Sequence, residues 1–178
     1  MKYKPTILVV LFTLVSTFIF SQENWQTFET ETFAINYPED WSYSDNKPNP
    51  MVQAVFFSPE ITQVKDQFRE NVNLTVEDLK SVELNIQEYT KLALDQVEKQ
   101  ISSAKILNQS STTISGLEAR IIIWSADFGN GILLKLKQLY TISNGKAYVL
   151  TFSSTIAEYD EYSEIGDNIL KSFKLLNT

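Results

Sequence analysis

The sequence predicts an α+β domain, an α-β-α sandwich in which a six- to seven-stranded, mostly antiparallel sheet is flanked by two main helices. Three observations predict it. Much of the chain consists of short segments of alternating or continuous apolar residues that end at turn residues, as strands do. Two longer segments, residues 86–103 and the residues after 155, place apolar side chains every three or four positions, as amphipathic helices do. Several strands are apolar on both faces, so each side of the sheet needs a covering helix.

The first 21 residues are predicted to be a secretory signal peptide. A lysine-containing start precedes an apolar run over residues 7–15, and Ser21 is a small residue suited to cleavage. An uncleaved N-terminal anchor helix is the alternative, although this run is short for a membrane span of about 20 residues. We therefore expect a signal peptide at 1–21 and a single domain at 22–178, without a membrane span after cleavage.

The charge of the expected domain restricts its partners. Removal of two lysines with residues 1–21 leaves 13 basic and 22 acidic residues, a net charge of −9. Such a domain lacks the positive surface that nucleic acid requires, so we expect no nucleic-acid partner. The chain has no cysteine, which excludes disulfides and a lipid-modified cysteine anchor.

The first half of the expected domain alternates strands with polar segments. The segment over 52–58 is apolar on both faces and is therefore expected at the centre of the sheet, whereas 72–76 alternates and has one polar face. We expect residues 59–70 to form a polar surface segment. The two remaining strands are predicted at 25–28 and 33–37.

The first helix is predicted over residues 86–103. Asn85 and Glu88 have the spacing of a capping box, in which each side chain binds the backbone N–H of the other residue. The apolar stripe of this helix consists of Ile86, Tyr89, Ala93, Val97 and Ile101.

Four strands joined by tight turns are predicted to follow as an antiparallel meander. The turns are Ser115-Gly116, Gly129-Asn130-Gly131 and Asn144-Gly145, of which the last is a strong hairpin signal because both residues tolerate positive φ. The strands are expected at 105–114, 117–126, 132–143 and 146–154.

The last helix is predicted to begin at Thr155, with Glu158 completing a second capping box. Gly166 interrupts this helix at a cost of about 1 kcal/mol relative to alanine. A close approach between the helix and the sheet would explain a glycine at this position.

These segments together resemble a known family. The residues that carry the resemblance are, in chain order, FAINYPEDW, NVNLTVEDL, GLEARIIIW, KAYVLTFSS and ILKSFKLL. Over about residues 28–176 the chain resembles the PsbP-like family, which includes the photosystem II subunit PsbP of plants and bacterial envelope proteins of the DcrB type. The shared motifs are mainly structural, so they indicate a fold more than a function.

The resemblance implies an α-β-α sandwich that usually lacks catalysis. Plant members support the oxygen-evolving centre and have been linked to manganese or calcium. This chain has no histidine, so a family metal site that uses imidazole cannot be carried over. We therefore assign no metal ligand, no cofactor and no catalytic residue.

Composition excludes several catalytic mechanisms independently of the family. Without histidine or cysteine there can be no Ser-His-Asp triad, no cysteine nucleophile and no ordinary zinc site. The kinase-like tripeptide at 127–129 lacks its companion motifs and is interpreted as a hairpin turn. Five acids early in the last helix are interpreted as a solvated face rather than a calcium site: Glu158, Asp160, Glu161, Glu164 and Asp167.

Three aromatic residues are the candidate ligand or partner contacts: Trp41, Tyr43 and Trp124. Aromatic side chains serve binding surfaces, but they serve cores more often. Trp124 lies within an apolar strand, which favours the core. In the segment YPEDW we expect Glu39 and Asp40 in an exposed turn and Trp41 turned back to the edge of the core.

We therefore expect a non-enzymatic binding or accessory module of the cell envelope, periplasmic or secreted. Its partner would be an envelope protein or a small ligand. One alternative is a carrier that holds a small apolar or sugar ligand between sheet and helix. The other is a small hydrolase that works through carboxylates.

Overall fold

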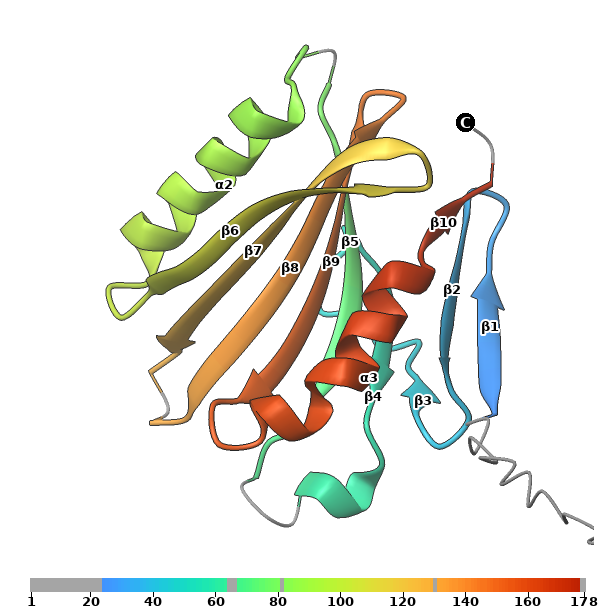
Figure 1. Cartoon of the computed structure of the whole chain (residues 1–178), viewed down its shortest axis with the longest axis vertical. Coiled ribbons are helices and arrows are strands. Elements are labelled where there is room, and N and C mark those ends of the chain that lie inside the picture. The colour runs from blue at the N-terminus through green and yellow to red at the C-terminus, as the bar shows by residue number, and fades with distance from the viewer. Residues whose placement is uncertain (1–23, 64–66, 81, 130, 177–178) are drawn as a thin grey trace, which may run out of the picture.

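A computed structural model describes residues 24–63, 67–80, 82–129 and 131–176. Its main feature is a seven-stranded sheet in which every neighbouring pair of strands is antiparallel. The predicted fold class is confirmed (Figure 1). In spatial order the strands are β3 (Ser42–Tyr43), β4 (Val52–Phe57), β5 (Asn71–Asp78), β9 (Lys146–Thr155), β8 (Leu133–Ser143), β7 (Leu117–Asp127) and β6 (Lys105–Ile114).

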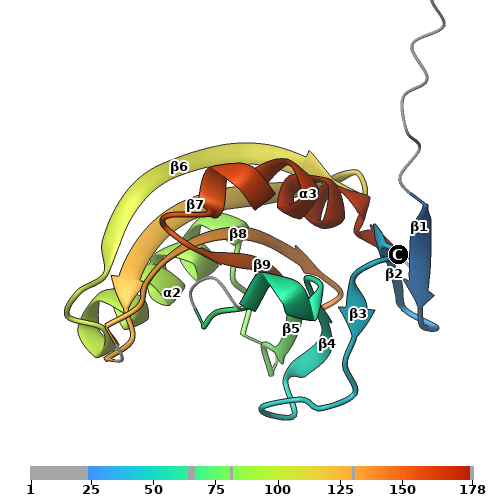
Figure 2. The ribbon, with the colours of Figure 1, turned by 90° about the horizontal axis from the view of Figure 1, so that it is seen from below.

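Two helices cover opposite faces of this sheet. Helix α2 (Ile86–Gln100) contacts β7 and β8, whereas α3 (Tyr159–Ser172) contacts β9 and β5. Figure 2 shows the curved sheet between them. The predicted sandwich is therefore present, but each helix covers only part of its face.

The N-terminal strands form a separate small sheet instead of joining the large one. Strand β2 (Phe33–Pro38) lies between β1 (Trp25–Glu29) and β10 (Lys174–Leu175), and both neighbours are antiparallel to it. The small sheet packs beside α3, since β2 contacts that helix. The predicted signal peptide at 1–21 lies outside the described residues.

The sheet separates two apolar clusters. The cluster on the α3 side is built around Phe56, Phe152 and Phe173, each at most 1% exposed. The cluster on the α2 side contains Ile122 and Trp124. Strand β9 is buried along all residues except Lys146, because side chains on both of its faces enter a cluster.

The two helices begin differently. Asn85 Oδ1 accepts the backbone N–H of Glu88 at 2.9 Å, and Glu88 Oε2 accepts that of Asn85 at 3.0 Å, so the first capping box is confirmed. The second is wrong. Thr155 pairs with Leu134 as the last residue of β9, and α3 begins at Tyr159 without a side-chain cap.

The turn chemistry agrees with the sequence analysis. Ser115 and Asn144 both have φ of 50°, and each precedes a glycine in the two-residue turn of a hairpin. Asp127 Oδ1 accepts the backbone N–H groups of Gly129 at 2.8 Å and Gly131 at 3.1 Å. The kinase-like tripeptide is therefore a turn that connects β7 to β8.

The segment over 59–70 is more buried than its polar composition predicts. It contains a short 3-10 helix, η1 (Glu60–Thr62), but Glu70 at its end is fully buried. Ser58 Oγ donates to Glu70 Oε2 at 3.2 Å, and Ser154 Oγ is 3.5 Å from Oε1. A buried carboxylate needs such donors, so Glu70 belongs to the interior and not to the surface.

Gly166 marks a close approach of α3 to the sheet. A Cβ atom on Gly166 would lie 2.6 Å from Cγ of Phe152, whose ring is fully buried. The close approach expected from the sequence is confirmed.

Substitution Gly166→Ala should therefore destabilise the protein despite the better helix propensity of alanine. Overpacking costs about 1–3 kcal/mol, and alanine recovers about 1 kcal/mol in the helix. Urea unfolding should show a net loss of up to about 2 kcal/mol. The exposed Asn168→Ala is the matched control in the same helix and should be neutral or stabilising. A stabilised Gly166→Ala protein would show that Phe152 can move.

Tyr159 ties the start of α3 to the sheet. Its side chain is 5% exposed, and Lys135 Nζ lies 3.8 Å from the ring centroid. Burial, aided by the charges of Asp167 and Asp160, raises the pKa of the Tyr159 phenol to about 12.

This shift predicts an alkaline loss of stability. Folding favours the neutral phenol, so the contribution of Tyr159 is fully present below the unfolded pKa of about 10. It is lost as the pH rises from about 10 to about 12. Unfolding curves across this range should show a smaller decline for Tyr159→Phe than for the unchanged protein. Equal declines would contradict the assignment.

Candidate functional site

The three predicted aromatic contacts lie in different environments. Trp41 and Trp124 are each 3% exposed, but Trp41 belongs to the cluster on the α3 side and Trp124 to the cluster on the α2 side. The sheet separates them, so the structure does not bring them together. Tyr43 is partly buried and stacks on Phe28 with ring centroids 4.5 Å apart. A binding role for these residues stays a prediction, and Tyr43 is the one with accessible surface.

Trp124 is part of a hydrogen-bond network beneath α2. Its Nε1 donates to Gln138 Oε1 at 2.8 Å, the Tyr140 hydroxyl donates to the same oxygen, and Gln138 Nε2 donates to Thr151 Oγ1 at 3.1 Å. Burial raises the pKa of the Tyr140 phenol, which keeps the donor protonated. The polar atom of Trp124 is thus satisfied within the core, and α2 covers it.

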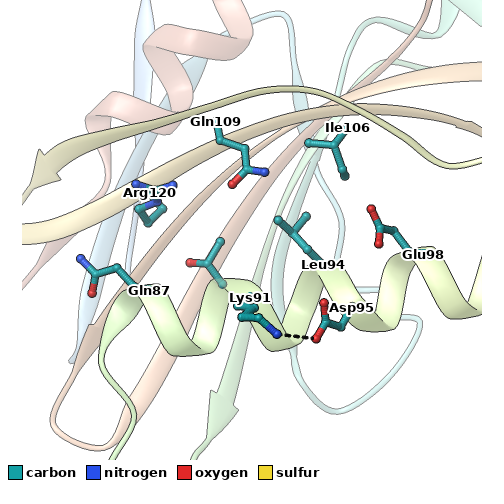
Figure 3. Close-up of a pocket in the computed structure, with 9 residues that line it drawn as sticks. Gln87, Lys91, Leu94, Asp95, Glu98, Ile106, Gln109 and Arg120 are labelled. Atoms are coloured by element: carbon teal, nitrogen blue, oxygen red, sulfur yellow. Dashed lines mark hydrogen bonds and ion pairs between the residues drawn. The ribbon is translucent and has the colours of Figure 1, made fainter.

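The structure contains a groove that no sequence motif indicates. It has a volume of about 320 Å3 and lies between α2 and the strands β6 and β7 (Figure 3). It exists because α2 packs on β7 and β8, while β6 is the edge strand beyond them. We call it the α2 groove; its lining residues are Gln87, Thr90, Lys91, Leu94, Asp95 and Glu98 of α2, Ile106 and Gln109 of β6, and Arg120 of β7.

Arg120 is the unusual residue of the α2 groove. Its Nη1 donates to Ser111 Oγ at 2.8 Å, but its Nε is buried and has no hydrogen-bond partner among the described residues. None of the ion pairs found in the described part of the chain includes Arg120. A buried donor on a charged group is costly without a partner, so this guanidinium is incompletely satisfied.

The two ends of the α2 groove differ in charge. Figure 3 shows Arg120 and Gln87 toward one end, and Asp95 and Glu98 toward the other. Leu94 and Ile106, which lie between the ends, provide an apolar section (Figure 3).

Two of these polar groups have partners of their own. Lys91 Nζ lies 3.1 Å from Asp95 Oδ2, an ion pair along one turn of α2. Gln87 Nε2 donates to Glu118 Oε1, which holds this carboxylate beside the groove. Glu98 is exposed and is absent from the ion pairs of the described residues. Arg120 and Glu98 are therefore the opposite charges that remain available.

A second hollow, of about 640 Å3, lies near the start of α2 and is more open to solvent. Asn85 and Glu88 line it, but both side chains already form the capping box. These two polar groups are thus engaged in holding the helix, which makes the α2 groove the better candidate for recognition.

The acidic start of α3 is only partly the solvated face that the sequence suggests. Glu158 is 7% exposed, and Asp167 forms an ion pair with Lys137. The other three acids are exposed: Asp160, Glu161 and Glu164. Across the described ranges, no group of three or more acidic side chains has the arrangement of a metal site.

Sequence reasoning missed the α2 groove because its residues belong to no motif. One signal was present: in the strand segment ARIIIW, a charged Arg120 alternates with Ile122 and Trp124, which face the α2 cluster. That pattern places an arginine on a buried face. It does not reveal that this strand lies next to the edge of the sheet.

Because the hydrogen bonds of Arg120 are incomplete, replacing this residue should not destabilise the protein. Substitution Arg120→Met keeps an apolar stem, removes the orphaned donor and loses one bond to the exposed Ser111. Because an unsatisfied buried donor costs about 1–3 kcal/mol and the lost bond contributes about 0.5–1.5 kcal/mol, the free energy of unfolding should stay equal or rise. Urea unfolding measures this.

Lys137→Met is the matched control for that measurement. It removes one of the two lysine partners of Asp167, across the partly buried pair between β8 and α3, and leaves Lys171 in place. The loss should fall between the ~0–1 kcal/mol of surface pairs and the ~3–5 kcal/mol of buried ones. If Arg120→Met were as destabilising as this control, Arg120 would be a structural residue.

Comparisons with solved structures identify the fold. The cyanobacterial PsbP of Synechocystis sp. PCC 6803 is 15% identical, with a TM-score of 0.60, and the match covers 92% of this chain and 99% of that one. LpqN of Mycobacterium tuberculosis, described as involved in cell envelope biogenesis, is 14% identical with a TM-score of 0.59 and coverage of 80% and 82%. PA94 of Pseudomonas aeruginosa, a protein of unknown function, is 14% identical with a TM-score of 0.60 and coverage of 83% and 94%.

At these identities the similarity shows the fold alone. No curated protein matches the chain. Within the described ranges, no helix has the length and apolar character needed to cross a membrane. The PsbP family model matches residues 23–175. The chain therefore belongs to the PsbP family.

Proposed function

We propose that the chain is an exported, non-enzymatic binding or accessory module of the cell envelope, periplasmic or secreted, and that it binds its partner or ligand in the α2 groove. The observation that carries the proposal is the buried Nε of Arg120, which has no hydrogen-bond partner among the described residues and belongs to a residue that lines the groove. A ligand group that accepts from this guanidinium would supply what the fold does not.

Export is supported by the N-terminal pattern over residues 1–21, which lies outside the described residues. A neighbour of the same fold, LpqN, is described as involved in cell envelope biogenesis. We do not assign the role of LpqN to this chain. Its description is consistent with an extracytoplasmic location for a module of this fold.

The absence of catalysis is supported by chemistry and by the family. The chain has neither histidine nor cysteine, so the usual nucleophile activation is missing. The remaining route is a pair of carboxylates. In the α2 groove, Asp95 is paired with Lys91 and Glu98 is exposed, so neither occupies the buried apolar pocket of a carboxylate general acid.

A small-ligand carrier is the second candidate, and the position of the α2 groove favours it. The alternative drawn from the sequence places a ligand between sheet and helix, which is where this groove lies. Its lining mixes charged, amide and apolar side chains, which suits an amphipathic polar ligand better than a purely apolar one.

The proposal is tested by recovering the protein from its own envelope fraction and analysing it by native mass spectrometry. Gln109→Trp should fill the α2 groove from β6 without removing a core residue, because Gln109 is exposed. Ser110→Trp is the matched control, since the next residue of the strand points to the opposite face. A stoichiometric partner or small molecule should be present with the unchanged protein and Ser110→Trp, and lost with Gln109→Trp.

Two results would overturn the proposal. Recovery of the protein from the cytoplasm only would contradict export. Equal retention of the bound species by both tryptophan variants would show that binding occurs outside the α2 groove.

A further inference from the structure

We infer that the α2 groove binds short peptides with free termini, three or four residues long, with the carboxylate at Arg120 and the ammonium at Glu98. This inference rests on the proposed function and gives the chemical class of its ligand. It follows from the charges, the length and the lining of the groove.

The charges at the two ends require a ligand that carries both signs. An anion alone would satisfy Arg120 but would bring no partner to Glu98 at the other end, where Asp95 is already paired with Lys91 (Figure 3). A cation alone would leave the guanidinium of Arg120 incompletely hydrogen-bonded. A zwitterion complements both ends, and, being neutral overall, it is not repelled by an acidic protein.

The guanidinium of Arg120 has the orientation and the free hydrogen-bonding capacity to bind a carboxylate. Its bond from Nη1 to Ser111 Oγ orients the guanidinium, while its buried Nε has no hydrogen-bond partner among the described residues. The planar fork of a guanidinium allows arginine to bind a carboxylate with two parallel hydrogen bonds. The competing carboxylate of Glu118 already accepts a hydrogen bond from Gln87.

The length of the α2 groove selects a peptide over a single amino acid. Eleven residues separate Gln87 from Glu98 along α2, which at 1.5 Å per residue is about 16 Å. An extended peptide of three or four residues spans about 10–13 Å, and the long side chains of Arg120 and Glu98 reach inward from the two ends. The two charged groups of a free amino acid are too close together to meet both.

The middle of the groove suits a peptide backbone with a small apolar side chain. Gln109 presents an amide that can both donate to a peptide carbonyl and accept from a peptide N–H. Leu94 and Ile106 provide the apolar contact. The volume of about 320 Å3 accommodates a ligand of this size.

The test is a titration of the purified protein with the tripeptide Ala-Leu-Ala, followed by two-dimensional NMR. Three blocked forms serve as probes: the N-acetyl peptide, the C-terminal amide and the doubly blocked peptide. The free peptide should shift the resonances of residues that line the α2 groove. Loss of either terminal charge should weaken binding roughly tenfold or more, because hydrogen bonds to charged groups are the strong ones.

Variants assign each terminus to its residue. Arg120→Met should weaken the free peptide at least about tenfold and leave the affinity of the C-terminal amide unchanged. Arg120→Lys should recover only part of this loss, because lysine lacks the planar fork. Glu98→Gln should weaken the free peptide and leave the N-acetyl form unchanged. Lys99→Gln, an exposed neighbour outside the groove, is the matched single-charge control and should change nothing.

The inference is overturned if the blocked peptides bind as tightly as the free one, a comparison that uses the unaltered protein and does not depend on the variants. Its failure differs from failure of the proposed function. If the peptides do not shift the groove resonances while Gln109→Trp still loses its native species, the groove binds another class of ligand. If neither experiment detects binding in the groove, both proposals fall.

Discussion

The rest of the structure depends on the burial of β9 on both faces. This strand pairs with β5 on one side and β8 on the other, and nine of its ten residues are buried. A strand buried in this way needs a layer on each face, which divides the apolar residues into two clusters. The α3 layer comes so close that only a glycine fits above Phe152. At this contact the helix and the sheet are therefore closely packed.

The packing of helix on sheet is less complete at the edge of the sheet. Strand β6 lies three strands away from β9 in the sheet, and α2 packs on β7 and β8 without covering it. The helix and the edge strand consequently leave a groove lined by a mixture of polar and apolar residues, most of which are at least partly exposed. Substitutions there disturb few core contacts, so a binding surface can change while the sandwich stays intact.

The fold was largely predictable because its signals are local. Turn residues such as Asn144, the cap at Asn85 and the glycine at 166 each act through neighbours in sequence or through a single close contact. The failures required tertiary information. Thr155 looks like a helix cap but pairs with Leu134, and Glu70 is buried by a contact with Ser154, which lies 84 residues away. The α2 groove depends on strand order, which periodicity does not specify.

At the position of Arg120, the side chain that would be best for stability differs from the one that would serve the proposed binding. A side chain chosen only for stability at this position would be apolar, since Ile122 and Trp124 continue the same face into the core. The fold instead places a guanidinium there and satisfies it with one bond to an exposed serine. Its strand, β7, lies next to the edge strand β6, and a ligand that completes the hydrogen bonds of Arg120 would regain that free energy on binding. In a site of this kind, the unsatisfied hydrogen-bonding capacity of the unliganded protein contributes to the free energy of binding.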